Sequence, residues 1–473
     1  MDLELFQTPG LGDSSYLLAS GREAVLVDPQ RDAWRFVEAA KERGWRIRHV
    51  LETHVHNDYL SGALETRAAT GAEIVAPARG GYEFEHRAVD EGDAVEIGGL
   101  RLTALATPGH TPEHLAWLVT DFSTGRADPA PTAVFSGGSL LVGSVGRTDL
   151  LGPALTDALT RDQQRSLQRL AELPASTKVL PTHGAGSFCS AGPPGGQPTT
   201  TIAAEEFSNP GFRLADADPE TFRAEALAGL GRVPAYYAHM AAINRRGPRV
   251  LRKLTLPPPL DPEAFEARAA TGVRIVDARR REAFAAGHIR GSLNIELAAG
   301  AFAGYVGWLV PFAEPVLLVL PDAPDALAEA TTELLRVGYE WVPGWLEGGV
   351  DAWAASGRPV AAYGTTSMAE LARERAAGDG DDGRGLLLDV RQPIEWRDEG
   401  VVPGSHQIFV ADLVDRVSEL PSGEPVTVFC RSGHRAAMAA SILESAGREV
   451  RLVPKGGAGS WPEPLEPVGA AAE

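Results

Sequence analysis

The sequence predicts a multidomain α/β protein, with one larger domain followed by two smaller domains that repeat each other. Length is the first observation behind this prediction, because 473 residues exceed what one hydrophobic core usually organises. The second is the alternation of short apolar segments with helical stretches, which is typical of α/β folds. The third is an internal repeat in the second half, with roughly a hundred residues per copy.

The composition is that of a globular protein, with 44% hydrophobic and 23% charged residues. A formal charge of −19 argues against a nucleic-acid partner, because binding to phosphates needs a basic surface. No stretch approaches the ~20 apolar residues of a membrane span, and the first residues show no signal-peptide pattern. Cys189 and Cys430 fall in different predicted domains, so we expect free thiols and a cytoplasmic setting.

The first predicted domain covers residues 1–250. It opens with an expected hairpin within residues 17–27, a helix over 33–43 and a strand over 47–51. A proline-rich linker follows at residues 256–262, where neither a helix nor a central strand can continue.

Histidines follow several apolar segments of this domain. His54, His56 and Asp58 form an H-x-H-x-D segment directly after a predicted strand. Two imidazoles and a carboxylate on one short loop are a compact set of metal ligands. His110 and His183 come after later apolar segments, where loops at strand ends would hold them. The pattern therefore predicts a metal site formed by these five residues.

Other candidates in the chain receive a structural interpretation. His86, His239 and His288 have no ligand-like neighbours in the sequence. His114 is expected to be a loop or strand residue rather than a ligand. Cys189 could contact a substrate sulfur or be a buried inert thiol, and the sequence leaves both readings open.

The internal repeat predicts two small domains with parallel sheets, at residues 263–360 and 364–473. We call them the first repeat and the second repeat. The matching pairs of segments are 273–279 with 386–391, 287–292 with 400–405, 315–319 with 425–429, and 348–353 with 456–461.

In the second repeat an apolar strand leads directly into Cys430, and a helical stretch follows the loop. Backbone N–H groups that converge at a helix N-terminus stabilise an anion, so we expect Cys430 to be a thiolate nucleophile that carries a persulfide. Arg431 and Arg435 would add positive charge for an anionic substrate. The other predicted substrate contacts of this loop are Ser432, Gly433 and His434.

The first repeat departs from this pattern at the same place. Leu320 occupies the position that corresponds to Cys430, and Asp322 and Asp325 follow it. A leucine has no nucleophile, and an acidic loop would repel an anion. We therefore expect the first repeat to be catalytically silent, with a structural or docking role.

These motifs resemble two known families. The histidine segments resemble the metallo-β-lactamase fold, and the second half resembles the rhodanese domain, whose active loop has the pattern C-x-x-x-x-R. Their order resembles the persulfide dioxygenase–rhodanese fusion proteins of bacterial sulfide metabolism. The resemblance implies a metallo-β-lactamase αββα sandwich followed by two rhodanese-like parallel α/β domains.

The resemblance also implies a cofactor. In that family one Fe(2+) is held by two histidines and one aspartate, and the two histidines carry over to His54 and His110. The aspartate does not carry over, because Gly138 stands at its position. Tyr59 stands where binuclear relatives place a histidine for a second metal, to which His183 would also belong. A two-metal hydrolase is therefore the less expected outcome.

Three states of the metal domain stay open at this point. Iron could bind through His54 and His110 with water or Asp58. Zinc could bind through His54, His56 and His110. The pocket could instead be metal-free and bind only a thiol. Restoring the carboxylate with Gly138→Asp is expected to raise iron occupancy.

The expected function is that of a sulfur-metabolism fusion enzyme. The first domain would oxidise a low-molecular-weight thiol persulfide, such as that of glutathione, to sulfite, and Cys430 would transfer sulfane sulfur. Arg147 and Thr148 would help to position the thiol carrier, by resemblance only. The alternatives are a zinc-dependent thioester hydrolase fused to a sulfurtransferase, and a metal-free sulfur carrier. Expected partners are a thiol persulfide and sulfite or thiosulfate, and the oligomeric state stays open.

Overall fold

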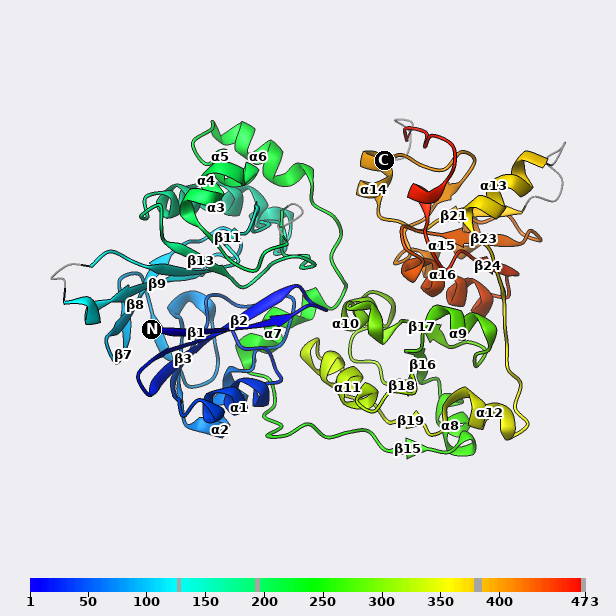
Figure 1. Ribbon diagram of the computed structural model, residues 1–473, viewed down its shortest axis with the longest axis horizontal. Helices are drawn as coiled ribbons and strands as arrows, with labels where there is room; N and C mark the ends of the chain where they lie inside the picture. The colour runs from blue at the N-terminus through cyan, green and yellow to red at the C-terminus, as the bar shows by residue number, and fades with distance from the viewer. Residues whose placement is uncertain (126–128, 192–195, 378–384, 469–473) are drawn as a thin grey trace. The chain divides into compact units, whose positions relative to one another are not determined.

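The computed structural model describes residues 1–125, 129–191, 196–377 and 385–468 (Figure 1). Contacts within the chain divide it into two compact units. One comprises Met1–Leu254 and Leu335–Gly338, and the other comprises Thr255–Leu334 and Tyr339–Glu473. Within the described ranges, no helix combines the length and apolar character that crossing a membrane requires.

Two six-stranded sheets form the centre of the first unit. The strand order is β1-β2-β3-β4-β5-β6 in one sheet and β14-β13-β10-β9-β8-β7 in the other. The predicted hairpin is present as the antiparallel pair of β2 and β3. The strands of this unit are β1 (Asp2–Thr8), β2 (Asp13–Ser20), β3 (Glu23–Val27), β4 (Arg46–Leu51), β5 (Glu73–Pro77), β6 (Arg87–Val89), β7 (Ala94–Ile97), β8 (Leu100–Ala106), β9 (Leu115–Asp121), β10 (Ala133–Gly137), β11 (Leu140–Leu141), β12 (Ser144–Val145), β13 (Lys178–Pro181) and β14 (Thr200–Thr201).

Apolar side chains fill the space between the two sheets and the space outside each of them. Tyr16 and Leu51 of one sheet pack with Trp117 and Phe135 of the other in one buried cluster. Helices α1 and α2 pack on the outer face of the first sheet, and α3 to α6 pack on that of the second. The layers therefore follow the order αββα. The helices are α1 (Trp34–Glu42), α2 (Ala63–Thr70), α3 (Pro153–Ala171), α4 (Ile202–Ser208), α5 (Pro210–Arg213), α6 (Pro219–Ala228) and α7 (Tyr237–Arg246), with short 3-10 turns η1 (Ala78–Gly80) and η2 (Phe122–Thr124).

The second unit contains two five-stranded parallel sheets with the same strand order. The order is β15-β19-β18-β16-β17 in the first repeat and β20-β24-β23-β21-β22 in the second. The proline-rich segment includes an edge strand, β15, that the sequence did not predict; an edge strand tolerates proline because its outer side needs no partner. The strands are β15 (Pro259–Leu260), β16 (Arg274–Asp277), β17 (Leu293–Asn294), β18 (Val316–Val319), β19 (Gly344–Leu346), β20 (Gly364–Thr365), β21 (Leu386–Asp389), β22 (His406–Gln407), β23 (Val426–Phe429) and β24 (Val450–Leu452).

Helices connect the parallel strands of each repeat, as parallel pairing requires. In the first repeat they are α8 (Pro262–Ala269), α9 (Arg281–Ala286), α10 (Phe302–Leu309), α11 (Ala326–Arg336) and α12 (Gly349–Ala355), with η3 (Leu297–Ala299). In the second they are α13 (Met368–Ala377), α14 (Pro393–Glu399), α15 (Leu413–Arg416) and α16 (His434–Ser445), with η4 (Val417–Glu419) and η5 (Ala458–Ser460).

Candidate functional site

The first candidate site lies where strands of the two sheets of the first unit end. The H-x-H-x-D segment follows β4, His110 follows the end of β8, and His183 follows β13. All these side chains are buried, together with three carboxylates that the sequence did not single out. We call the following group the histidine pocket, and each member is at most 1% exposed: Asp13, Asp28, Glu52, His54, His56, Asp58, His110, His114 and His183.

Ring nitrogens and carboxylate oxygens of this pocket lie close enough to share an ion. The Nε2 atoms of His54 and His183 are 3.3 Å apart. Ligand atoms of His54, His110 and His183 lie within 4.8 Å of one another, and so do those of His56, Asp58 and His183. A third group consists of Asp28, His54 and His56. The structure thus brings together all five residues that the sequence predicted as metal ligands.

Four polar atoms of the pocket lack a hydrogen-bond partner within the described part of the chain. They are Nδ1 of His56, Nε2 of His110, Oδ1 of Asp58 and Oδ2 of Asp13, and all four are buried. A buried polar atom without a partner costs on the order of 1–3 kcal/mol, so native structures rarely leave several together. Imidazole nitrogens and a carboxylate oxygen are ligands that zinc and iron accept. The residues present therefore fit a divalent metal.

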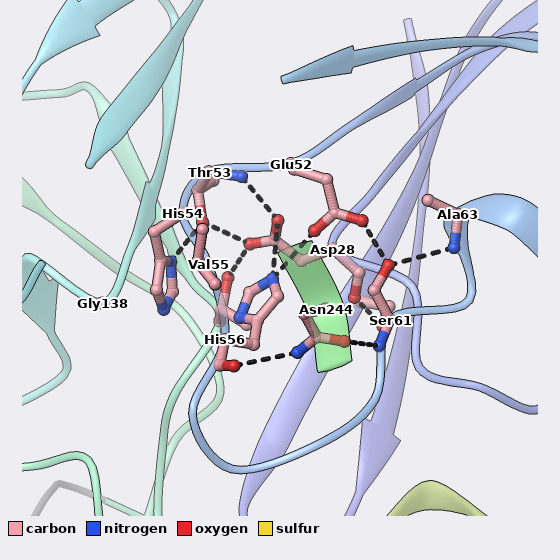
Figure 2. A network of polar contacts seen from close by, with 12 residues as sticks. Asp28, Glu52, Thr53, His54, Val55, His56, Ser61, Ala63, Gly138 and Asn244 are labelled. Atoms are coloured by element: carbon pink, nitrogen blue, oxygen red, sulfur yellow. Dashed lines mark hydrogen bonds and ion pairs between the residues drawn. The ribbon is translucent and has the colours of Figure 1, made fainter. Parts of the chain in front are cut away.

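A carboxylate layer orients His56 from behind (Figure 2). Its Nε2 atom lies 3.1 Å from Glu52 and 3.4 Å from Asp28 Oδ1. The Tyr59 hydroxyl also lies 3.1 Å from this Nε2 atom. The Tyr59 ring stacks on the imidazole, with the ring centroids 4.4 Å apart. Because these groups occupy Nε2, the ring turns its Nδ1 atom toward any metal, as the hydrogen-bonded outer shell of a metal site does.

Asp28 connects both sheets to this layer. It follows β3 with a φ of 49°, a left-handed conformation that aspartate adopts more readily than most residues. Its carboxylate accepts hydrogen bonds from Thr53 N at 2.8 Å, from the Thr53 hydroxyl at 2.7 Å and from the Thr182 hydroxyl. Thr53 follows β4 and Thr182 follows β13, so one carboxylate ties the two sheets together beside the pocket.

The charges of the pocket separate into two classes. Burial lowers the pKa of His54 well below its usual range and that of His110 to about 3, and neighbouring imidazoles add to both effects. Burial alone would also lower the pKa of His56 and of His183. Carboxylates outweigh it: Asp28 and Glu52 raise the pKa of His56, and Asp58 and Asp13 raise that of His183 to about 10. Because metal ligands must be neutral imidazoles, metal binding has to release protons from this pocket.

Gly138 lies against the histidine pocket but adds no ligand (Figure 2). Its backbone N–H donates to Nε2 of His114 at 2.9 Å. A Cβ atom at this position would lie 2.3 Å from Cδ2 of His110. The expectation that Gly138→Asp raises iron occupancy stays a prediction, and the ring of His110 would have to shift to make room for the new side chain.

Three further predicted residues take places in the wall of the pocket. Cys189 is fully buried, and its thiol lies 3.4 Å from Oδ2 of Asp58. Burial raises the pKa of this thiol well above its usual range, and the charge of Asp58 raises it further. Arg147 is buried, pairs with Asp149 at 2.7 Å and accepts at its carbonyl from Nδ1 of His110 at 2.9 Å. Thr148 lies 2.7 Å from the Thr160 hydroxyl, so the predicted contacts of Arg147 and Thr148 with a thiol carrier stay predictions.

The second candidate site is the loop of residues 430–435, which we call the cradle loop. Cys430 follows β23 and is fully buried, and the N–H of Gly433 donates to its sulfur at 3.1 Å. Gly433 has a φ of 97°, and α16 begins at His434. On the other side Gly457 packs directly on the Cys430 carbonyl, where a Cβ would lie 1.9 Å away. The sulfur thus faces an N–H donor at a helix N-terminus, which favours an anion.

Charged residues frame the cradle loop. Arg435 is nearly buried and pairs with Glu395 at 2.8 Å. Burial alone would lower the pKa of Arg435, but its contact with Glu395 raises it, so the guanidinium stays charged. Arg431 and Ser432 are exposed, and Arg431 lies 3.7 Å from Glu399. The predicted loop residues therefore lie around one sulfur, two of them accessible from solvent.

The first repeat keeps the frame of the second but not its loop. Arg279 pairs with Asp277 at 2.6 Å, as Arg391 pairs with Asp389 at 2.7 Å. Leu320 lines a cavity of about 560 Å³ whose walls include acidic residues such as Asp322 and Asp351. Among the residues that line this cavity, none is a nucleophilic cysteine, and the one positive charge is that of Arg279. Its guanidinium is already paired with Asp277.

Some functional residues could not be found from the sequence. Asp13, Asp28 and Glu52 lie far from the histidines along the chain or outside the H-x-H-x-D spacing, so no motif marked them. His114, expected to be a loop or strand residue, stacks on His54 at 5.0 Å within the pocket and bonds to Thr107 at 2.8 Å. Its position four residues after His110 was the available signal.

Two known families match separate parts of the chain. A family model described as metallo-beta-lactamase superfamily matches residues 8–183. A model described as rhodanese-like domain matches residues 261–356 and 367–462.

Individual relatives match different shares of the chain. Hydroxyacylglutathione hydrolase of Methylococcus capsulatus is 36% identical over 187 residues, which cover 38% of this chain and 66% of that protein. A protein of the same name from Rhodospirillum rubrum is 32% identical over 257 residues, which cover 51% of this chain and 85% of that protein. A solved structure of a metallo-beta-lactamase from Staphylococcus aureus subsp. aureus COL aligns with a TM-score of 0.64 at 28% identity, covering 73% of this chain and 98% of the other.

Proposed function

Because the chain belongs to the metallo-β-lactamase superfamily and carries two rhodanese-like domains, we propose that it is a sulfur-metabolism fusion enzyme. Its first domain oxidises the persulfide of a small thiol to sulfite, and its second repeat transfers sulfane sulfur through Cys430. The single observation that carries this proposal is the presence of a metal-fitting histidine pocket and a cradled thiol in one chain.

The histidine pocket supports the metal-dependent half. His54, His110 and His183 would hold an ion, with Asp58 beside it. Fe(2+), when bound there, would supply the activation of dioxygen toward the substrate sulfur. Gly138 contributes no side chain, and Tyr59 stands where two-metal relatives place a ligand histidine, so the pocket favours one metal over two. Burial of every ligand keeps bulk water away from the reacting sulfur.

The substrate class follows from the sulfur chemistry and from the relatives. Proteins named hydroxyacylglutathione hydrolase act, by that name, on a glutathione conjugate, which supports a glutathione-type thiol here. One persulfide anion, one dioxygen and one water would give one thiol, one sulfite and one proton. The S–S bond breaks, the outer sulfur is oxidised and dioxygen is reduced.

The cradle loop supports the sulfur-transfer half. The Cys430 thiolate attacks the outer sulfur of thiosulfate, the S–S bond breaks, and sulfite leaves with the electron pair. Cys430 then carries a persulfide, whose negative charge the Gly433 N–H stabilises. In the reverse direction sulfite takes the outer sulfur and leaves as thiosulfate. The first domain would thus produce the acceptor that the second repeat consumes.

A second candidate function is a zinc-dependent thioester hydrolase attached to the same sulfurtransferase. The names of the relatives favour it, and so does the group of three imidazoles, since zinc takes three histidines and leaves a position for water. Both candidates share the cradle loop and differ only in the metal chemistry.

Elemental analysis of the purified full chain, with two activity assays, separates these functions. Iron with oxygen uptake on glutathione persulfide supports the oxidation. Zinc with cleavage of a glutathione thioester and no oxygen uptake replaces it with the hydrolase. A chain that retains neither metal, and that has neither activity after loading with either, contradicts both metal-dependent functions and leaves sulfur transfer alone.

A further inference from the structure

Two residues of the first repeat contact the cradle loop of the second. Arg281 begins α9, and its Nε atom donates to the carbonyl of Pro454. The same Nε atom would lie 2.9 Å from a Cβ placed on Gly433, so the guanidinium covers the backbone of the loop. Glu296 accepts two hydrogen bonds from Nη1 of Arg281, both at 2.9 Å, and another from its backbone N–H at 2.5 Å.

Glu296 also faces a residue of the loop itself. Its Oε2 atom lies 3.4 Å from Nε2 of His434, the residue with which α16 begins. Glu296 is 6% exposed, whereas the His434 side chain is 31% exposed. The contact joins a buried carboxylate of the first repeat to a partly exposed side chain at the N-terminus of the helix that follows Cys430.

Helix α10 of the first repeat also packs against the second repeat near the cradle loop. On α10, Trp308 packs edge-on against Phe409 of the second repeat, with ring centroids 5.3 Å apart. Tyr305 lies three residues earlier and therefore on the same face of that helix. Burial raises the pKa of the Tyr305 phenol, and the charges of Arg435, Cys430 and Glu395 also act on it. Tyr305 is thus within electrostatic reach of the sulfur.

We propose that the first repeat completes the Cys430 site: Glu296, held by Arg281, is a positioning residue that fixes His434 and the cradle loop for an anionic sulfur donor. This inference rests on sulfur transfer at Cys430 and gives the silent repeat a role in that reaction.

The charges explain why this arrangement suits an anion. A lone carboxylate beside the loop would repel thiosulfate. The bidentate contact with Arg281 neutralises Glu296, so the carboxylate can hold His434 without imposing its charge on the site. With His434 held in place through its Nε2 atom, the start of α16 is fixed and the backbone N–H groups of the loop stay convergent.

The second repeat offers a matched control in another histidine–glutamate contact between the repeats. His288 of the first repeat lies 3.0 Å from Glu444 of the second. Glu444 is near the other end of α16, roughly 15 Å from His434 along the helix axis. Glu296→Gln and Glu444→Gln therefore remove the same kind of contact across the same interface, and only the first is at the cradle loop.

The test measures thiosulfate:cyanide sulfur transfer by the full chain and its two glutamine variants. Glu296→Gln should lower kcat/KM for thiosulfate roughly tenfold, because a misplaced group costs about that much or more, and should lower kcat/KM for cyanide far less. Glu444→Gln should leave both constants near the values of the unaltered chain. Glu296→Asp, which keeps the charge, should recover part of the loss.

The outcomes separate this inference from the proposed function. Equal losses in the two glutamine variants, or no loss in Glu296→Gln, would overturn it, because the interface would then serve docking alone. Absence of transfer in the unaltered chain would instead refute the sulfurtransferase function itself. If Glu296→Gln does not fold, His434→Asn removes the same contact from the more exposed side, and it must show the same selective loss for thiosulfate.

Discussion

The two cysteines of the chain are both fully buried, but the polar groups that face their sulfur atoms carry opposite charge. Cys189 lies beside the carboxylate of Asp58, which together with burial keeps a proton on its sulfur. Cys430 instead receives the N–H of Gly433 at the start of a helix. Burial therefore does not distinguish a nucleophile from an inert thiol. The polarity of the atoms that face the sulfur does.

Replacement of each cysteine by serine should give the largest difference between the two sites. Cys430→Ser should lower thiosulfate:cyanide sulfur transfer by roughly a thousandfold or more, because a serine hydroxyl cannot carry the sulfane sulfur. Cys189→Ser, assayed in the same way, should retain the activity of the unaltered chain. Residual transfer in Cys430→Ser that disappears when Cys189 is also replaced would show that the wrong thiol was assigned.

Removal of an imidazole should test the region around Cys189 as a metal site. His110→Ala removes a donor whose Nε2 atom is buried without a partner in the described structure, so metal affinity should fall by about a hundredfold or more. The control is His406→Ala, an exposed histidine of the second repeat. Metal content after dialysis, measured by elemental analysis, reports the effect. Equal metal retention in both variants would remove His110 from the site.

A smaller effect is expected in the pH dependence of stability, which also tests the histidine pocket as a metal site. Without metal, the pKa of His183 is raised from 6.5 to about 10, so its contribution to stability is present below pH 6.5 and is lost as the pH rises through about 10. Metal binding needs the neutral ring, so its added stability should grow over the same interval. Melting temperatures of chelator-treated and metal-loaded protein, taken from pH 6 to 10, should therefore diverge. Parallel curves would contradict the pairing of His183 with Asp58 and Asp13.

A thiol introduced into the first repeat is expected to have no effect on sulfur transfer. Leu320→Cys places a thiol in the corresponding loop of the first repeat, where Asp322 and Asp325 follow and no arginine takes the place of Arg435. In a Cys430→Ser background this third cysteine should leave sulfur transfer at the level of Cys430→Ser alone. Recovered activity would mean that a thiol at this strand end suffices without the cradle.

Much of the fold followed from local patterns. The predicted fold class, a metallo-β-lactamase domain before two rhodanese-like domains, is confirmed by the family matches. The repeat was visible because equivalent segments, such as 273–279 and 386–391, keep the same residue types at the same spacing. The structure shows the reason, since the two segments form β16 and β21, which hold the same place in sheets with one strand order.

The candidate sites were predictable only where their residues share a segment or follow a strand. The H-x-H-x-D segment meets both conditions. Asp13 and Asp28 come from other strands: pairing of β3 with β4 places Asp28 beside His56, and the closure of the sandwich places Asp13 beside His183. The close approach of the Gly138 backbone to the ring of His110 was equally invisible, because it depends on where two separate loops pass each other. Contacts of this kind are encoded by tertiary packing and leave no spacing in the sequence.

Through Asp28, a metal ion in the histidine pocket would be coupled to the stability of the fold as well as to catalysis. Since its single carboxylate spans the seam of the sandwich and also backs His56, any loosening of that seam must disturb the coordination sphere at once. Cofactor escape would then precede melting during heating or in mild denaturant. A colorimetric chelator could follow the release of the metal in real time. The rate of release would then report how stably the two sheets pack against each other.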